Sequence, residues 1–179
     1  MIGIAKELGL KTVNVVRRAE LIPDLLALGA DKVILDGDGL SERVAAATGG
    51  APVRFVIDAV AGTATQRMAE CLAVGGVLAC YGILSEQPCT VAGDLLFTRN
   101  LAVKGFCTPF YETDTPRTDW LKMMSSLAEW TAEGKLKAKI AATYPLEKYK
   151  DAICHEMESG SARDGKVVIL PNPDLIAGA

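Results

Sequence analysis

Two adjacent arginines have the most distinctive chemistry in this sequence. Arg17 and Arg18 directly follow Thr12–Val16 (TVNVV), a β-branched run that is too short for a helix and typical of a strand buried on both faces. Two guanidinium groups at a strand end can bind a phosphate through charge-assisted, often bidentate hydrogen bonds. Taken without further context, however, two arginines after a strand are more simply a solvated surface pair.

Two later apolar runs also end in residues that could do chemistry. Asp58 ends Arg54–Asp58 (RFVID) and precedes small residues, a pattern more typical of a cap that holds the loop through its backbone N–H groups than of a catalytic carboxylate. Tyr81, Gly82 and Ile83 end the next run. The Tyr81 phenol is either a proton donor or, more simply, an aromatic wall residue.

Four further residues complete the candidates. Phe106 and Cys107 end the strand-like run Leu101–Phe106, but Cys107 would need a nearby base or a depressed pKa to act as a nucleophile, and its sequence neighbours provide neither. Lys166 opens the last apolar run and is either a ligand-binding or a solvated lysine. His155 lies among acidic residues, a pattern typical of an exposed helix face.

Alternating strands and helices must position these residues. Six strands are predicted, at Thr12–Val16, Asp31–Leu35, Arg54–Asp58, Gly76–Tyr81, Leu101–Phe106 and Lys166–Leu170. Helices are expected over Ile2–Leu8, Pro23–Ala30, Ser41–Thr48, Thr63–Leu72 and Thr118–Glu133, and a short extended piece followed by a helix within Tyr144–Glu158. This alternation predicts right-handed βαβ units around a parallel sheet, with ligands at the carboxyl ends of the strands.

The composition excludes several classes of protein. A chain of 179 residues with 50% hydrophobic and 23% charged residues is typical of one globular domain. Its net charge of −3 and pI near 5.3 argue against nucleic acid or an anionic membrane as a partner. No apolar run approaches the ~20 residues of a membrane span, and Lys6 and Glu7 lie where a signal peptide would be apolar. We therefore expect a soluble, cytoplasmic protein.

The cysteine pattern disfavours a metal site. Five cysteines lie far apart, no CxxC pair occurs, and the chain has one histidine. Neither a zinc site nor a disulfide framework fits this pattern. Reduced, mostly buried thiols are expected, with no metal.

Several segments, in order, carry a resemblance to a known family. They are IAKELGLKTVNVVRR, LLALGADKVI, FVIDAVAG, LAVGGVLACYG, DLLFTRNLAVKGF and GKVVI. Together they resemble the medium-chain dehydrogenase/reductase superfamily from Met1 to about Leu170. Within it, NVVRR is most similar to the trans-2-enoyl thioester (enoyl-CoA) reductases and the quinone oxidoreductases.

This resemblance implies a Rossmann-like, three-layer α/β fold with a parallel sheet that binds NADPH. An NAD-specific site would place an acidic residue after the strand, whereas cations accommodate the 2′-phosphate of NADPH. The implied cofactor-binding residues are Arg17 and Arg18 for that phosphate, Tyr81, Gly82 and Ile83 beside the nicotinamide, Phe106 and Cys107 completing its wall, and Lys166 closing over the cofactor.

The resemblance also implies parts that this sequence does not contain. We expect residues 1–170 to form a partial NADP-binding domain and residues 171–179 a C-terminal tail, with an N-terminal catalytic domain absent. The central first strand and its Gly-rich turn are expected to be missing, which would leave open edges on the strands around Val15 and Val56. A truncated gene product, a wrong start codon or a deliberate fragment would each explain this.

The expected function is hydride transfer from NADPH to an activated C=C bond of a 2-enoyl thioester, or to a quinone. The small-molecule substrate would bind through the missing domain, so no catalytic residue is assigned. A homodimer is expected, because in the family the strand edge near Gly105–Cys107 forms the dimer contact. The alternatives are a module that binds a nucleotide without catalysis and a dimerising or structural chain.

Overall fold

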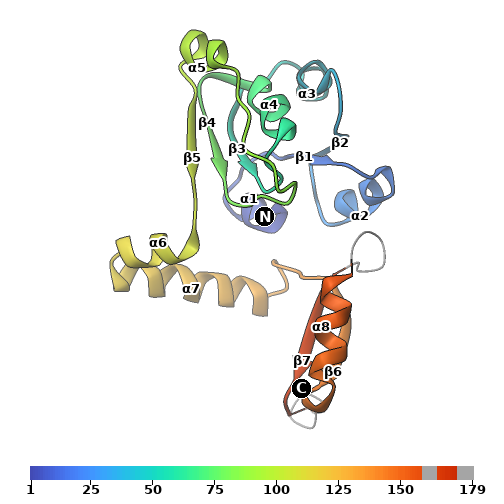
Figure 1. Ribbon diagram of the computed structural model, residues 1–179. Coiled ribbons are helices and arrows are strands. Elements are labelled where there is room, and N and C mark those ends of the chain that lie inside the picture. Colours follow the sequence, from blue (N-terminus) through green and yellow to red (C-terminus); the bar gives the residue numbers. More distant parts are fainter. Residues whose placement is uncertain (159–164, 173–179) are drawn as a thin grey trace. The chain divides into compact units, whose positions relative to one another are not determined.

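The computed structural model describes residues 1–158 and 165–172 of the chain. These residues belong to two compact units, Met1–Ala128 and Glu129–Ala179. In chain order the elements are α1 (Ile2–Glu7), β1 (Val13–Val16), η1 (Ala19–Leu21), α2 (Ile22–Ala27), β2 (Lys32–Leu35), α3 (Leu40–Thr48), β3 (Val53–Asp58), α4 (Thr63–Glu70), β4 (Leu72–Cys80), α5 (Gly93–Arg99), β5 (Ala102–Gly105), α6 (Thr108–Asp114), α7 (Arg117–Ala132), β6 (Ile140–Pro145), η2 (Leu146–Lys148), α8 (Tyr149–Met157) and β7 (Lys166–Leu170). Figure 1 shows them along the chain.

The first unit contains two parallel sheets. One pairs β1 with β2, and the other has the order β3-β4-β5 (Figure 1). Within the described residues, β1 and β3 each have one strand partner, so the predicted open edges around Val15 and Val56 are confirmed. The predicted burial of β1 on both faces is wrong, because all four of its residues are only half-buried.

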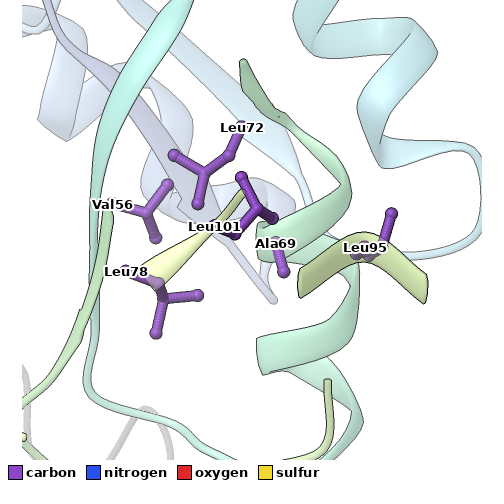
Figure 2. Packing of buried hydrophobic residues seen from close by; sticks show 6 residues of the cluster. All are labelled: Val56, Ala69, Leu72, Leu78, Leu95 and Leu101. Carbon is purple, nitrogen blue, oxygen red and sulfur yellow. The ribbon is translucent and has the colours of Figure 1, made fainter. Parts of the chain in front are cut away.

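The main core of this unit lies between the three-stranded sheet and the helices α4 and α5. Figure 2 shows its six buried side chains, Val56, Ala69, Leu72, Leu78, Leu95 and Leu101. Successive side chains of a strand point to opposite faces, so Val56 is buried while its neighbour Phe55 is 60% exposed. Burying a leucine side chain contributes roughly 1.5–3 kcal/mol, so this face of the sheet holds α4 and α5 in place.

A second core joins the two sheets. Ile34, Leu40 and Val44 are buried together, and Val53 of β3 and Met68 of α4 pack against them. Helix α3 ends at Gly49, whose φ of +62° is the left-handed conformation that glycine adopts without steric cost. The turn that follows leads directly into β3.

The second unit contains one parallel pair of strands, β6 and β7, with α8 against them. His155 does not lie on an exposed face as expected. It is half-buried on α8, and its Nδ1 is 3.0 Å from the hydroxyl of Tyr144 on β6. Residues 173–179 of the predicted tail lie outside the described residues.

Most predicted elements occur within a few residues of their expected bounds, and two short helices were missed. Helix α5 begins at a glycine and has seven residues, too few for a visible helical period. It is held by Leu95 in the core and by Arg99, whose Nη1 donates to the carbonyl oxygen of Glu70 at 2.9 Å. Helix α6 contains Pro109 in its first turn and has no buried residue.

The expectation of mostly buried thiols is also wrong. Cys89, Cys107 and Cys154 are exposed, while Cys71 and Cys80 are half-buried. None of the five is joined in a disulfide. Cys107 is the residue before α6, and Cys154 lies on the exposed surface of α8. The spacing of the cysteines along the sequence does not reveal this exposure.

No helix in the described part of the chain has the length and apolar character to cross a membrane.

Candidate functional site

The carboxyl end of β1 presents the two predicted arginines. Arg17 is exposed, and Arg18 is half-exposed at the point where the chain turns into η1. The Arg18 Nε lies 3.8 Å from Glu20 Oε1, a long contact between two solvated side chains. Exposed ion pairs of this kind contribute little. Both guanidinium groups therefore remain available to an anion at this strand end.

Directly beside this strand end lies an acidic residue that sequence reasoning missed. The backbone N–H of Asp36, at the end of β2, donates to the carbonyl oxygen of Val16 at 2.7 Å. Its carboxylate accepts two hydrogen bonds from Arg67 on α4, at 2.8 Å from Nε and 2.7 Å from Nη2. This bidentate bond holds the pKa of Asp36 below its ordinary value. The Asp36 carboxylate is thus already paired with a guanidinium group.

The same ion pair connects two parts of the fold. Asp36 and Arg67 are 31 residues apart, one after β2 and the other on α4. Arg43 supports the turn after β2 by donating to the carbonyl oxygens of Leu35, at 3.0 Å, and Gly37, at 3.3 Å. The alternating aspartate and glycine residues at 36–39 (DGDG) indicate a turn, but no local sequence pattern identifies Arg67 as the partner of Asp36.

At the end of β3, Asp58 acts as the predicted cap. It is 3% exposed, and its Oδ1 accepts from the backbone N–H groups of Val60, at 2.8 Å, and Ala61, at 3.3 Å. The hydroxyl of Thr65, which is fully buried, donates to Oδ2 at 2.6 Å. These bonds fix the loop between β3 and α4. Sequence reasoning identified Asp58 but not Thr65.

The ends of β4 and β5 bring five predicted residues together. The Tyr81 N–H donates to the carbonyl oxygen of Asp58 at 2.9 Å, and the Phe106 N–H donates to that of Cys80 at 2.8 Å. Tyr81, Ile83, Phe106 and Cys107 are exposed, while Gly82 is half-buried. A Cβ at Gly82 would lie 2.9 Å from the carbonyl oxygen of Ala59, so the loop packs closely on the end of β3.

Phe106 begins a chain of aromatic contacts. Its ring lies 5.5 Å from that of Tyr111, which in turn lies 6.2 Å from Trp120. Such tilted pairs stabilise a wall of aromatic side chains. Cys107, the residue before α6, has no imidazole or carboxylate bonded to it among the described residues.

Lys166 does not share a unit with the other candidates. It is the exposed first residue of β7, and its N–H donates to the carbonyl oxygen of Lys139 at 2.8 Å. A Cβ at the preceding Gly165 would lie 2.7 Å from that same oxygen. Gly165 therefore lets the backbone before β7 approach the backbone of Lys139 more closely than a residue with a Cβ could.

Two hollows lie at the opposite, amino ends of the strands. The larger has a volume of about 440 Å³ and is lined by the beginnings of β3 and β4, including Val53 and Leu72. The smaller, about 200 Å³, lies near Thr12 and Asp31 at the beginnings of β1 and β2. Neither includes a predicted site residue. Because ligands of parallel α/β sheets bind at the carboxyl ends, we place the candidate site at the strand ends instead.

The parallel strands and their flanking helices define a Rossmann-like α/β protein. The chain belongs to the zinc-binding dehydrogenase family, whose model matches residues 28–169. This confirms the predicted membership of the medium-chain dehydrogenase/reductase superfamily.

Within residues 1–158 and 165–172, the structure contains no group of three or more His, Cys, Asp or Glu side chains placed to hold a metal ion.

One curated relative is the mitochondrial enoyl-[acyl-carrier-protein] reductase of Xenopus tropicalis. It is 32% identical over 161 residues, which are 86% of this chain and 46% of the relative. The chain thus spans about half the length of the curated relatives it matches.

Solved structures share the fold at lower identity. A Bacillus thuringiensis protein assigned as an NADPH:quinone reductase has a TM-score of 0.81 and 23% identity, covering 93% of this chain and 50% of that one. Etr1p in complex with NADP and crotonyl-CoA has a TM-score of 0.76 and 22% identity, covering 88% and 48%. The mitochondrial 2-enoyl thioester reductase heterodimer Etr1p/Etr2p of Candida tropicalis has a TM-score of 0.78 and 21% identity, covering 93% and 49%.

Proposed function

We propose that this chain binds NADPH and forms the cofactor-binding part of an oxidoreductase that reduces the activated C=C bond of a 2-enoyl thioester. A quinone is the second candidate substrate, because both kinds of reductase occur among its relatives and structural neighbours. The activity of the relatives belongs to proteins about twice as long as this chain.

The arginine pair at the end of β1 is the observation that carries this proposal. Arg17 and Arg18 stand where an NAD-specific protein of this fold has an acidic residue for the ribose hydroxyl. The adjacent carboxylate, Asp36, is bonded on both oxygens to Arg67 and so does not repel a phosphate. Two solvent-accessible cations at the same edge as this paired acid favour the 2′-phosphate of NADPH over the bare ribose of NADH.

The ends of β4 and β5 would hold the other half of the cofactor. Tyr81, Ile83 and Phe106 offer exposed apolar surface, and Gly82 lets the backbone approach closely. NADPH supplies the hydride when it is bound, while these residues orient the nicotinamide and shield it from water. Lys166 is proposed to close over the cofactor.

The domain assignment follows the same interpretation. Residues 1–170 form the NADP-binding region and residues 171–179 a tail, with substrate bound largely by residues outside this chain. A homodimer through β5 is part of the proposal, because β5 ends its sheet with an exposed edge that includes Val103 and Lys104. Light scattering of the purified chain tests this, and a monomer at all concentrations would exclude it.

A non-catalytic nucleotide-binding or dimerising chain is the alternative. The half-length match to the relatives is the observation in its favour. NADPH binding without oxidation of NADPH by a 2-enoyl thioester or a quinone would fit the nucleotide-binding module. A stable dimer that binds no cofactor would fit the structural one.

A fluorescence titration with NADPH, with NADH in parallel, tests the proposal. The variant is Arg17→Ala/Arg18→Ala, and the control, Arg117→Ala/Lys122→Ala, removes two exposed cations from α7. Hydrogen bonds to charged groups are worth about 1.5–3 kcal/mol each when well formed. Solvation at the exposed end of β1 reduces the contribution of each hydrogen bond. We therefore expect NADPH to bind roughly tenfold to hundredfold more weakly to the arginine variant.

NADH binding should change little in the variant, because NADH has no phosphate at that position. Circular dichroism establishes that each sample is folded. Equal losses in the variant and the control, or no preference for NADPH in the unmodified chain, would contradict the arginine assignment.

A further inference from the structure

Two thiols meet at the carboxyl end of β4. Cys80 is the last residue of that strand, and Cys89 lies nine positions later in the connection to α5. The two sulfur atoms are 3.4 Å apart, with the Cys89 thiol directed at the Cys80 sulfur. Cys80 is half-buried and Cys89 is exposed to solvent. The two sulfur atoms are therefore in contact with each other, and a reagent in solution can reach Cys89.

The loop between them is fixed to the preceding strand end at several points. Leu84 and Ser85 donate their N–H groups to the carbonyl oxygens of Ala59, at 3.0 Å, and Val60, at 2.9 Å. These bonds fold the chain back so that Cys89 returns to Cys80. A disulfide has an S–S distance of about 2.05 Å, so the sulfurs need to approach by little more than an ångström. A side-chain rotation is of that size, and the backbone bonds can stay in place.

The other cysteines are less suited to react with Cys80. Cys71 is half-buried at the C-terminal end of α4, and burial raises the pKa of its thiol to about 11. Cys107 is exposed at the end of the neighbouring strand, two residues beyond the Gly105 that pairs with Cys80. Cys154 belongs to the second unit.

We propose that Cys80 and Cys89 are a redox-active dithiol, which hydrogen peroxide oxidises to an intramolecular disulfide. The Cys89 thiol loses its proton and attacks a peroxide oxygen; the O–O bond breaks, hydroxide leaves and takes up that proton as water, and Cys89 becomes a sulfenic acid. The Cys80 thiolate then attacks that sulfur; the S–S bond forms, the S–O bond breaks, and a second water leaves. Two thiols together lose two electrons and two protons, and hydrogen peroxide is reduced to two waters.

The environments of the two thiols set their roles. Cys89 reacts first because it is exposed. Cys80 is the resolving thiol: burial raises its pKa, and its S–H donates to the carbonyl oxygen of Gly82 at 3.3 Å. The intervening loop contains Tyr81, Gly82 and Ile83, so the disulfide would restrain the loop assigned above to the cofactor in the conformation that its backbone bonds already give it. That last link rests on the proposed function, whereas the disulfide itself does not.

Peptide mapping of the full chain tests the proposal. The reduced protein is treated in dilute solution with one equivalent of hydrogen peroxide, alkylated, and digested with trypsin and a glutamate-specific protease. Cleavage after Glu70, Glu86 and Arg99 separates the two cysteines into the peptides 71–86 and 87–99. We expect these peptides to be joined, also in a Cys71→Ser background, which leaves Cys80 as the one cysteine of the first peptide.

Single variants give the controls. Cys80→Ser and Cys89→Ser should each reduce this cross-link to background, while Cys107→Ser should leave it unchanged. The share of the cross-link that forms within one chain should not fall as the protein concentration is raised through the micromolar range, because the effective concentration of a thiol within a short loop is in the millimolar range or above. A cross-link to Cys107, one between two chains, or over-oxidation of Cys89 without a cross-link would each overturn the proposal. No cofactor is needed, so failure here is distinguishable from failure of NADPH binding.

Discussion

Replacing Arg67 with methionine should destabilise the first unit. Methionine keeps most of the apolar stem but removes both hydrogen bonds to Asp36. The Asp36 carboxylate would keep the backbone N–H of Gly37, at 2.8 Å, as its remaining hydrogen bond among those described. The side chains of Arg67 and Asp36 are 25% and 13% exposed. This places the pair between exposed ion pairs, worth about 0–1 kcal/mol, and buried pairs whose disruption costs 3–5 kcal/mol. We expect a loss of about 2 kcal/mol in the free energy of unfolding.

The effect should depend on pH in one direction. The pKa of Asp36 in the folded protein is lowered, chiefly by its hydrogen bonds with Arg67, from the ordinary value of 3.8. A carboxyl group with a depressed pKa contributes stability that is fully present above its unfolded-state pKa and is lost as the pH falls through the folded-state pKa. The difference between the unmodified chain and Arg67→Met should therefore be constant from pH 7 down to about 5. It should shrink below about pH 4, where an aspartate without the Arg67 hydrogen bonds, as in the unfolded chain, becomes protonated.

Urea denaturation followed by circular dichroism at several pH values measures this difference. Lys11→Met is the matched control, because Lys11 is 89% exposed and pairs with Asp31 at 2.9 Å. It should change the unfolding free energy less than Arg67→Met does. An Asp36→Asn variant completes a double-mutant cycle, in which the two changes should not add. Equal costs for the two cation variants, or a cost for Arg67→Met that is the same at pH 3 as at pH 7, would refute this reasoning.

Substitutions at three further positions test the core and the loops. Leu78→Ala, in the middle of the buried cluster (Figure 2), should cost about 3 kcal/mol in urea denaturation, and a cost below 1 kcal/mol would mean that the cluster is not the core of the sheet. Thr65→Val removes the 2.6 Å hydrogen bond to buried Asp58 and should cost about 1–2 kcal/mol, whereas Thr65→Ser should recover most of it. Gly82→Ala places a Cβ 2.9 Å from the carbonyl oxygen of Ala59 and should cost about 1–2 kcal/mol. It should also weaken NADPH binding in the titration, and unchanged affinity would remove this loop from the proposed site.

The strand and helix order could be predicted because its signals are local. The run Lys166–Leu170 and the helix ending at Gly49 lie where β-branched residues and a left-handed glycine indicate them. The cap at Asp58 follows from the same short-range chemistry, since its backbone partners are two and three residues away. By contrast, α5 depends on contacts with α4, whose Gln66 side chain accepts from the Ala92 N–H at 2.6 Å. Seven residues carry too little periodicity to predict a helix that distant residues stabilise.

The sequence by itself determined the fold class, the parallel strands and the placement of Arg17 and Arg18 at a strand end. The period of the hydrophobic residues and the positions of the glycine residues are enough to predict these features, because each feature depends on residues within one turn or one strand. Only the tertiary structure decided that Arg67 neutralises Asp36 and that Cys89 returns to Cys80. Those pairings depend on where packing places α4 and on how the loop after β4 is bonded to the end of β3. Residue types and spacing do not encode such distances, since a side chain meets a distant partner only after the core between them has formed.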